Sequence, residues 1–171
     1  CGIFVAFNKN NLEHSCEFYE KFREDLVHRG PDASGKYFSR NVYLGFNRLK
    51  IVDLSDEANM PMTDSGNRFI LVFNGQIYNY KILRETLLKD CTFKTNSDSE
   101  VILEGFKKFG KTFFDKMDGM WAILIYDKLE EKLIISRDRL GIKPLYYSKI
   151  NNEVYFASEQ KALINLFQKK N

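Results

Sequence analysis

The first residue of the chain, Cys1, combines two groups that catalysis can use. A free α-amine has a pKa of about 7.7–8.0, whereas a lysine side chain titrates near about 10.4. An N-terminal cysteine therefore carries a nucleophilic thiol and a general base on one residue, and the amine can take the thiol proton and later give it to a leaving amine. The alternative is that Cys1 is a small buried hydrophobic residue at the end of a fragment. Position alone favours this alternative.

Asn74 and Gly75 follow an apolar run at residues 69–73. Asn-Gly is a strong signal for a two-residue hairpin turn, but a helical pattern, not an alternating strand, comes next. A corner between a strand and a helix directs backbone N–H groups to one point, and the asparagine amide adds a donor. The pair is therefore a candidate oxyanion hole for acyl transfer. The residues alone leave the hairpin turn and the oxyanion hole equally open.

Arg48 and Asp98 are charged residues that could either bind a ligand or have a purely structural role. Arg48 stands among apolar residues, where a guanidinium could bind a carboxylate through two hydrogen bonds, although an arginine at a strand edge is the commoner situation. Ser97 and Glu100 have the spacing of a capping box that begins a helix. Asp98 then suits the positive end of the helix dipole, and its carboxylate could equally bind a substrate ammonium. Without other evidence, capping is the favoured interpretation.

Length and composition restrict the class of protein. The 171 residues correspond to one domain, and 44% hydrophobic with 15% aromatic residues exclude a disordered or collagen-like chain. The net charge of +3 is small and its basic residues are scattered, so nucleic acid is not an expected partner. The longest apolar run, at 120–126, is far shorter than the ~20 residues of a membrane span, and we expect no secretory signal because no basic region precedes an apolar one.

The three cysteines are too few and too widely spaced for a disulfide framework. The two histidines do not add a metal-binding pattern to them, so we expect no metal site. A reducing cytosol is the compartment that this cysteine content favours.

The hydrophobic pattern predicts an α+β domain with mainly antiparallel sheets and helices outside them. Apolar residues four positions apart indicate a helix over 15–28, and similar patterns indicate helices over 77–88, from about Ser97, and over 159–167. Segments 28–32 and 136–147 combine charged and turn-forming residues, and by themselves they predict only structured turns. Strands are predicted at residues 1–7, 42–46, 49–54, 69–73, 120–126, 132–137, 145–148 and 154–157.

Eight short motifs in a fixed order carry a resemblance that none of them carries alone. They are CGIF at the start, HRGPD (28–32), RLKIVDLS (48–55), NGQIYN (74–79), SDSEVI (97–102), DGMWAILIYD (118–127), RDRLGIKPLYY (137–147) and FASEQKAL (156–163). Together they resemble the class II glutamine amidotransferase domain, and above all the glutaminase domain of asparagine synthetases. The resemblance covers residues 1–171 as one glutaminase domain.

The resemblance implies an N-terminal nucleophile hydrolase, an αββα sandwich in which two antiparallel sheets are stacked between helical layers. In this family the initiator methionine is removed, and the exposed cysteine attacks the side-chain amide of glutamine. By position, Cys1 is then the nucleophile and, through its amine, the general base. Asn74 and Gly75 form the oxyanion hole.

The resemblance also implies how glutamine is bound. Arg48, with the backbone near Val52, holds the α-carboxylate, and Asp98 holds the α-ammonium. The family usually has glutamate where this chain has Gln76, a histidine at Phe46 and a serine at Lys50. Position 76 lies beside the substrate ammonium in the family. We therefore expect a working glutaminase with weak affinity for glutamine.

The implied partners are L-glutamine and a C-terminal synthetase domain of the same protein, and a homodimer remains open. No cofactor is expected for residues 1–171, since ATP and Mg²⁺ belong to the synthetase domain. Its ammonia acceptor is aspartate by default, or another carboxylate such as that of a surface sugar. Two other classes stay open: an N-terminal cysteine acylase for other amides, and a non-catalytic glutamine-sensing domain that Gln76 would mark.

Overall fold

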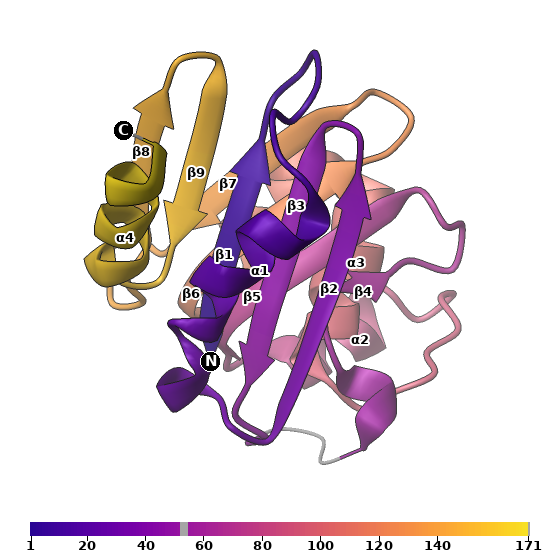
Figure 1. Cartoon of the computed structure of the whole chain (residues 1–171). Helices are drawn as coiled ribbons and strands as arrows, with labels where there is room; N and C mark the ends of the chain where they lie inside the picture. Colours follow the sequence, from indigo (N-terminus) through magenta and orange to yellow (C-terminus); the bar gives the residue numbers. More distant parts are fainter. Residues whose placement is uncertain (52–54, 171) are drawn as a thin grey trace.

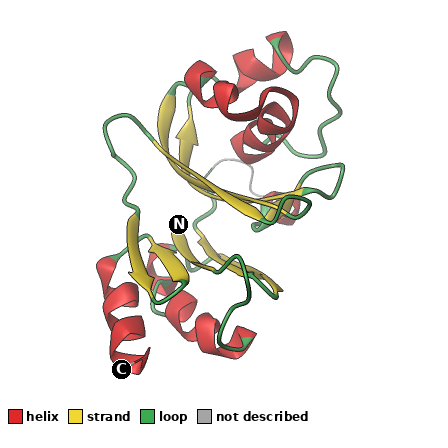
Figure 2. Ribbon diagram, turned by 90° about the horizontal axis from the view of Figure 1, so that it is seen from above, coloured by secondary structure: helices red, strands yellow, loops and turns green. Residues whose placement is uncertain are grey.

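Two antiparallel β-sheets lie face to face at the centre of the computed structural model, which describes residues 1–51 and 55–170 (Figures 1 and 2). Helices cover the outer face of each sheet, so the layers follow the order helix, sheet, sheet, helix (Figure 2). The predicted α+β class and the αββα sandwich are confirmed.

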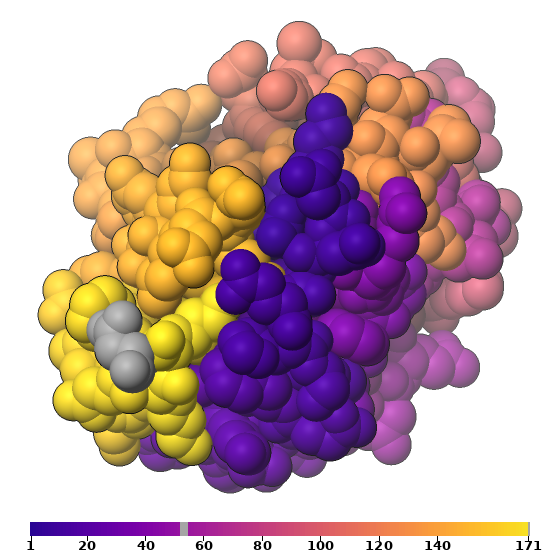
Figure 3. All heavy atoms as spheres, turned by 45° about the horizontal axis from the view of Figure 1, so that its top comes forward, coloured from indigo at the N-terminus to yellow at the C-terminus, as the bar shows by residue number. Residues whose placement is uncertain are grey.

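The five-stranded sheet has the order β2-β3-β1-β9-β8. Its strands are β1 (Gly2–Phe7), β2 (Ala33–Ser39), β3 (Val42–Arg48), β8 (Tyr146–Ile150) and β9 (Glu153–Ala157). Helices α1 (Cys16–Glu24) and α4 (Gln160–Lys170) pack on its outer face, with the 3₁₀ turn η1 (Val27–Arg29) beside it. The first and last segments of the chain therefore lie side by side on the surface (Figure 3).

The four-stranded sheet has the order β4-β5-β6-β7. Its strands are β4 (Met62–Thr63), β5 (Phe69–Ile77), β6 (Gly119–Asp127) and β7 (Lys132–Arg137). Helix α3 (Asp98–Phe109) packs on it, and α2 (Tyr80–Thr86) packs on α3. The 3₁₀ turns η2 (Asp56–Ala58) and η3 (Gly110–Lys116) complete the described elements.

Strand β1 is buried on both faces because it is the central strand of its sheet. Successive side chains of a strand point to opposite faces. Ile3 and Val5 accordingly join the core between the sheets, whereas Phe4 and Ala6 join a second core under α1 and α4. This double burial explains why residues 1–7 read as a continuous apolar run.

The predicted strand over 49–54 is wrong for residues 49–51, and residues 52–54 lie outside the described part. The backbone N–H groups after β3 have acceptors that are not in a strand. Leu49 donates to the thiol of Cys1 at 3.4 Å, and Lys50 donates to the carboxylate of Asp32 at 2.8 Å. Ile51 is 70% exposed. The chain therefore leaves the sheet at Arg48 although Leu49 and Ile51 are apolar.

Asn74 and Gly75 form neither a hairpin turn nor a strand-to-helix corner. Strand β5 continues through them to Ile77, opposite Ala122 and Trp121 of β6. The predicted helix over 77–88 therefore begins too early, and α2 starts at Tyr80.

Other differences concern the edges of elements. The helix predicted over 15–28 ends at Glu24, and the 3₁₀ turn Val27–Arg29 replaces its last turn. Strands β2 and β4 were not predicted, since β2 alternates between half-buried and exposed positions at the sheet edge, and β4 has two residues. The cap of α3 is as predicted: the Ser97 side chain accepts the backbone N–H of Glu100 at 3.2 Å.

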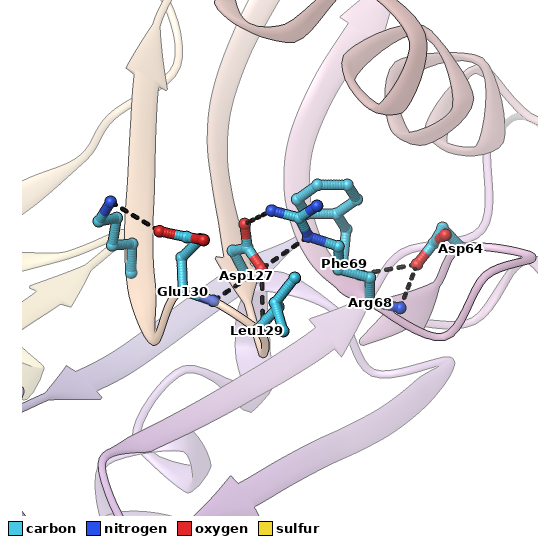
Figure 4. A network of polar contacts seen from close by, with 7 residues as sticks. Asp64, Arg68, Phe69, Asp127, Leu129 and Glu130 are labelled. Carbon is cyan, nitrogen blue, oxygen red and sulfur yellow. Dashed lines mark hydrogen bonds and ion pairs between the residues drawn. The ribbon is translucent and has the colours of Figure 1, made fainter.

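A polar network anchors the end of the β5–β6 pair that is remote from Asn74 (Figure 4). The Arg68 guanidinium donates to both carboxylate oxygens of Asp127, at 3.0 and 2.6 Å, and lies 4.8 Å from the ring centroid of Phe69. The same carboxylate accepts the backbone N–H groups of Leu129 and Glu130, which close the turn between β6 and β7. Asp127 thus fixes the register of the strand pair that carries Asn74.

We expect Asp127→Asn to lower the free energy of unfolding by about 1–3 kcal/mol at neutral pH, the usual range for hydrogen bonds to a charged group. The Arg68 side chain is partly exposed, which keeps the effect below that of a fully buried ion pair. The hydrogen bonds from Arg68 lower the pKa of Asp127. The wild-type advantage is therefore present above the unfolded-state pKa of about 3.9 and is lost as the pH falls through the lower folded-state pKa. Urea titrations followed by Trp121 fluorescence measure it.

Glu130→Gln is the matched control because the Glu130 pair with Lys132 is exposed, and it should change stability by less than about 1 kcal/mol. Equal stability of Asp127→Asn and wild type at pH 7 would contradict the anchoring role.

Candidate active site

A cavity of about 160 Å³ opens where the beginning of β1, the end of β3, β5 and the beginning of α3 meet. Every predicted site residue in the described part of the chain lines it. These residues are Cys1, Arg48, Asn74, Gly75, Gln76 and Asp98. Val52, predicted to contribute its backbone, lies outside the described residues. Arg29 and Lys143, which the sequence analysis left in structured turns, line the same cavity.

Backbone groups hold the thiol of Cys1. The Leu49 N–H donates a hydrogen bond to Sγ at 3.4 Å, and the thiol donates one to the Leu49 carbonyl oxygen at 3.6 Å. The carbonyl oxygen of Cys1 accepts a hydrogen bond from Arg29 Nε at 2.9 Å. The sulfur therefore has a fixed position beside the cavity.

The α-amino group of Cys1 is suited to act as a base at neutral pH. Burial, and secondarily the positive charges of Arg29 and Lys143, lower the pKa of this amine to about 6. An amine with this pKa is about 90% deprotonated at pH 7, so its lone pair is available to take a proton. An ordinary α-amine would be mostly protonated there.

Arg29 joins two motifs that are far apart in the sequence. It belongs to HRGPD, and its Nη1 lies 2.9 Å from Oε1 of Glu159 in FASEQKAL. His28 Nε2 lies 2.9 Å from the same oxygen. Sequence reasoning missed this contact because the partners are 130 residues apart, and the only signal for it was the presence of both motifs in one chain.

Asn74 presents an unpaired donor to the cavity. Its side chain is 4% exposed, and within residues 1–51 and 55–170 Nδ2 has no hydrogen-bond partner. A buried amide without a partner costs about 1–3 kcal/mol, so such a group is normally satisfied. A ligand oxygen in the cavity would satisfy it.

The register of β5 makes the backbone N–H of Gly75 a second hydrogen-bond donor of the site. Antiparallel bonds alternate along a strand, and just after β5 the Tyr78 N–H donates to the carbonyl oxygen of Asp118, the residue before β6. The odd-numbered residues of β5 therefore direct their N–H groups away from β6. Phe73 N–H reaches the sulfur of Met60 and Ile77 N–H reaches Asp98, and Gly75 lies between them on that edge.

Only glycine fits at position 75. A Cβ there would overlap the carbonyl oxygen of Met120 and lie 2.8 Å from Trp121 Cα, because the backbone of β6 passes close by. The close approach of two backbones thus accounts for the Asn-Gly pair inside a strand.

Asp98 is a buried carboxylate that pairs with no cation among the described residues. It is 4% exposed, and one oxygen accepts the Ile77 N–H at 3.0 Å. Burial raises the pKa of Asp98, and the other groups that act on it in the described part of the chain are backbone N–H groups at the start of α3. A cationic group in the cavity would complement this carboxylate.

Arg48 is held by the segment that follows β3. It is 5% exposed, and Nη1 donates to Ser55 O at 2.7 Å and to Asn59 Oδ1 at 2.6 Å. These bonds orient the guanidinium at the cavity wall. Gln76, half-buried, lies two residues after Asn74 on β5 and lines the same cavity with a neutral amide.

Among residues 1–51 and 55–170, no group of three or more His, Cys, Asp or Glu side chains is arranged to hold a metal ion. No helix in the described ranges has the length and apolar character needed to cross a membrane.

Comparison with known proteins identifies the family of the chain. The family model described as "Glutamine amidotransferase domain" matches residues 1–171. The chain is 41% identical over 168 residues to asparagine synthetase [glutamine-hydrolyzing] 1 of Bacillus subtilis, covering 96% of this chain and 26% of that protein. It is 42% identical over 167 residues to asparagine synthetase B of Escherichia coli, covering 96% and 30%. The chain therefore spans less than a third of the length of these relatives.

Solved structures share the fold at lower sequence identity. The glutamine phosphoribosylpyrophosphate amidotransferase of B. subtilis superposes with a TM-score of 0.81 at 20% identity, covering 96% of this chain and 43% of that one. A second structure, of an allosteric regulatory enzyme of purine biosynthesis, gives a TM-score of 0.82. Because a family model matches from the first residue to the last and relatives exceed 40% identity, the chain belongs to the glutamine amidotransferase domain family.

Proposed function

We propose that this domain hydrolyses the side-chain amide of glutamine to glutamate and ammonia, with Cys1 as nucleophile. One observation carries the proposal: the thiol and the amine of Cys1 share a cavity with an unpaired buried amide, Asn74, and an unmatched buried carboxylate, Asp98. The named function of the asparagine synthetases that the chain matches supports it.

The proposed reaction uses Cys1, Asn74 and Gly75 together with one water molecule. The neutral α-amine of Cys1 takes the thiol proton, and the thiolate attacks the amide carbon of glutamine. The resulting oxyanion would accept hydrogen bonds from Asn74 Nδ2 and the Gly75 N–H, since both residues line the cavity. The C–N bond then breaks as the protonated amine gives its proton to the leaving nitrogen, which departs as ammonia. Water attacks the thioester and releases glutamate, with Cys1 regenerated.

The α-groups of glutamine have complementary charges in the cavity wall. Arg48 would bind the α-carboxylate, together with the backbone near Val52, and Asp98 would bind the α-ammonium. Gln76 would accept one hydrogen bond from the same ammonium through its carbonyl oxygen. A paired cation and anion suit a free amino acid, which distinguishes this site from an acylase for simple amides.

The relatives' greater length suggests what uses the ammonia. We propose that a synthetase domain follows in the complete protein, that ATP and Mg²⁺ act only there, and that aspartate is the acceptor. A surface-sugar carboxylate is the alternative acceptor. The free state of Cys1, Cys16 and Cys91 fits a cytoplasmic location.

Cys1→Ala should lower the rate of glutamate and ammonia release at least about 10³-fold, because it removes the nucleophile but neither the fold nor the remaining site. The matched control is Cys91→Ser, a cysteine outside the cavity, which should retain kcat. Intact mass should show Cys1 as the first residue. Normal turnover by the alanine variant or by protein with a retained methionine would contradict the mechanism.

Asp98→Asn should raise KM for glutamine by about 30-fold or more, since removing one member of a desolvated charge pair costs about 2–5 kcal/mol. The substitution keeps the shape of the side chain, so kcat should change much less than KM. Asp115→Asn, at an exposed position, is the control. If the wild type turns over a simple primary amide as fast as glutamine, the acylase alternative holds instead.

Gln76→Glu should lower KM for glutamine and leave kcat nearly unchanged, because a carboxylate strengthens an interaction made equally in the ground and transition states. Steady-state kinetics of both proteins measure this. The specific competitor is a glutamine-sensing domain: binding of glutamine by calorimetry with no turnover in either protein would establish it.

A further inference from the structure

We propose that Lys143 is a positioning residue of this site, whose ammonium acts on Cys1 and thereby sets the lowest pH at which the domain works. This inference deepens the proposed function and rests on it. Lys143 lies in the motif GIKPLYY, between β7 and β8, and lines the cavity that contains Cys1. Nothing in the sequence pattern distinguished it from a residue of a structured turn.

The loop that carries Lys143 is built around one carboxylate. Asp138 is 5% exposed and accepts the backbone N–H groups of Leu140, Ile142 and Lys143 at 3.2, 2.8 and 3.0 Å. It also accepts the N–H of Trp121 on β6 at 3.1 Å, which ties the loop to the four-stranded sheet.

Arg137 fixes the other side of the same loop. Its Nε donates to the carbonyl oxygen of Lys143 at 2.8 Å, and its Nη2 donates to that of Gly141 at 2.8 Å. Gly141 has a φ of +63°, a left-handed conformation that glycine adopts without strain. Both polar backbone groups of Lys143 are therefore bonded, so the starting point of its side chain is well defined.

The Lys143 side chain is half-buried, and in the described part of the chain its ammonium makes no hydrogen bond or ion pair. The other cations at the cavity are engaged: Arg29 pairs with Glu159, and Arg48 donates to the segment after β3. Within residues 1–51 and 55–170, no carboxylate pairs with Lys143. Its field is therefore available to act on Cys1.

A positive charge beside Cys1 disfavours protonation of the amine and favours the thiolate. The pKa of the Cys1 α-amine is lowered first by burial, then by Arg29, then by Lys143. The buried Asp98 carboxylate lines the same cavity, and Glu159 reaches Cys1 only through Arg29. Since Arg29 pairs with Glu159, removing Arg29 would also leave that carboxylate without this partner, whereas removing Lys143 changes the charge near Cys1 alone.

The test compares Lys143→Met, which removes the charge and keeps the aliphatic chain, with Lys143→Arg, which keeps the charge. Lys149→Met, on the exposed side of β8 and outside the cavity, is the matched control. Two quantities are measured from about pH 5 to pH 9: kcat/KM for glutamine, and the rate of iodoacetamide alkylation of Cys1 followed by peptide mass spectrometry. The alkylation measurement does not require turnover.

We expect Lys143→Met to move the acidic limb of both profiles upward by about half a pH unit, as one partly screened charge would. The rate should fall about threefold near pH 5.5 and change little near pH 8. Lys143→Arg should restore the wild-type limb, and Lys149→Met should match the wild type.

Unmoved limbs in Lys143→Met, or a limb that Lys143→Arg fails to restore, would overturn the inference. A rise in KM at every pH with unmoved limbs would also overturn it and would make Lys143 a ligand of the substrate carboxylate. Lys143→Gln replaces the methionine variant if the latter is not folded by circular dichroism. Absence of turnover in the wild type would refute the proposed function instead, and the alkylation profile would still decide the role of Lys143.

Discussion

The site depends on holding the first residue of the chain in place. Chain ends are usually poorly ordered unless something ties them down. Here β1 begins immediately after Cys1 and pairs with β3 on one side and β9 on the other. Arg29 binds the carbonyl oxygen of Cys1, and the backbone of Leu49 contacts its sulfur. The proposed nucleophile, which precedes β1, thus acquires the fixed geometry that is normally found inside an element.

The electrostatics of the empty cavity favour a zwitterionic ligand. Burial disfavours the charged forms of two groups that line the cavity: it lowers the pKa of the Cys1 amine and raises the pKa of Asp98. An incoming ammonium beside Asp98 reverses the second effect, since an opposite charge stabilises the carboxylate. Ligand binding and ionisation of Asp98 are therefore linked. The positive charges of Arg29 and Lys143 act in the opposite sense on the Cys1 amine, because they favour its neutral form.

The elements predicted correctly from the sequence are those that a few neighbouring residues determine. Residues 132–137 form β7 as expected, and Ser97 caps α3, because an apolar run and a capping serine act within a few residues. The predicted strand fails at residues 49–51 because Leu49 N–H donates to a sulfur far away in sequence. The Asn74-Gly75 pair predicts a turn, yet Gly75 is a strand residue that pairs with Trp121 of β6, whose backbone passes close to it. Contacts of this kind become visible only in three dimensions.

The order of the motifs carried more information than any one motif, and the structure gives the physical reason. HRGPD contributes Arg29 at the cavity, GIKPLYY contributes Lys143, and FASEQKAL contributes Glu159, which holds Arg29. Each residue taken alone has an ordinary structural explanation as a turn or surface charge. Their common function is the environment of Cys1, and that environment exists only when β9 lies beside β1. The end of the sequence is therefore as much a part of the site as its beginning.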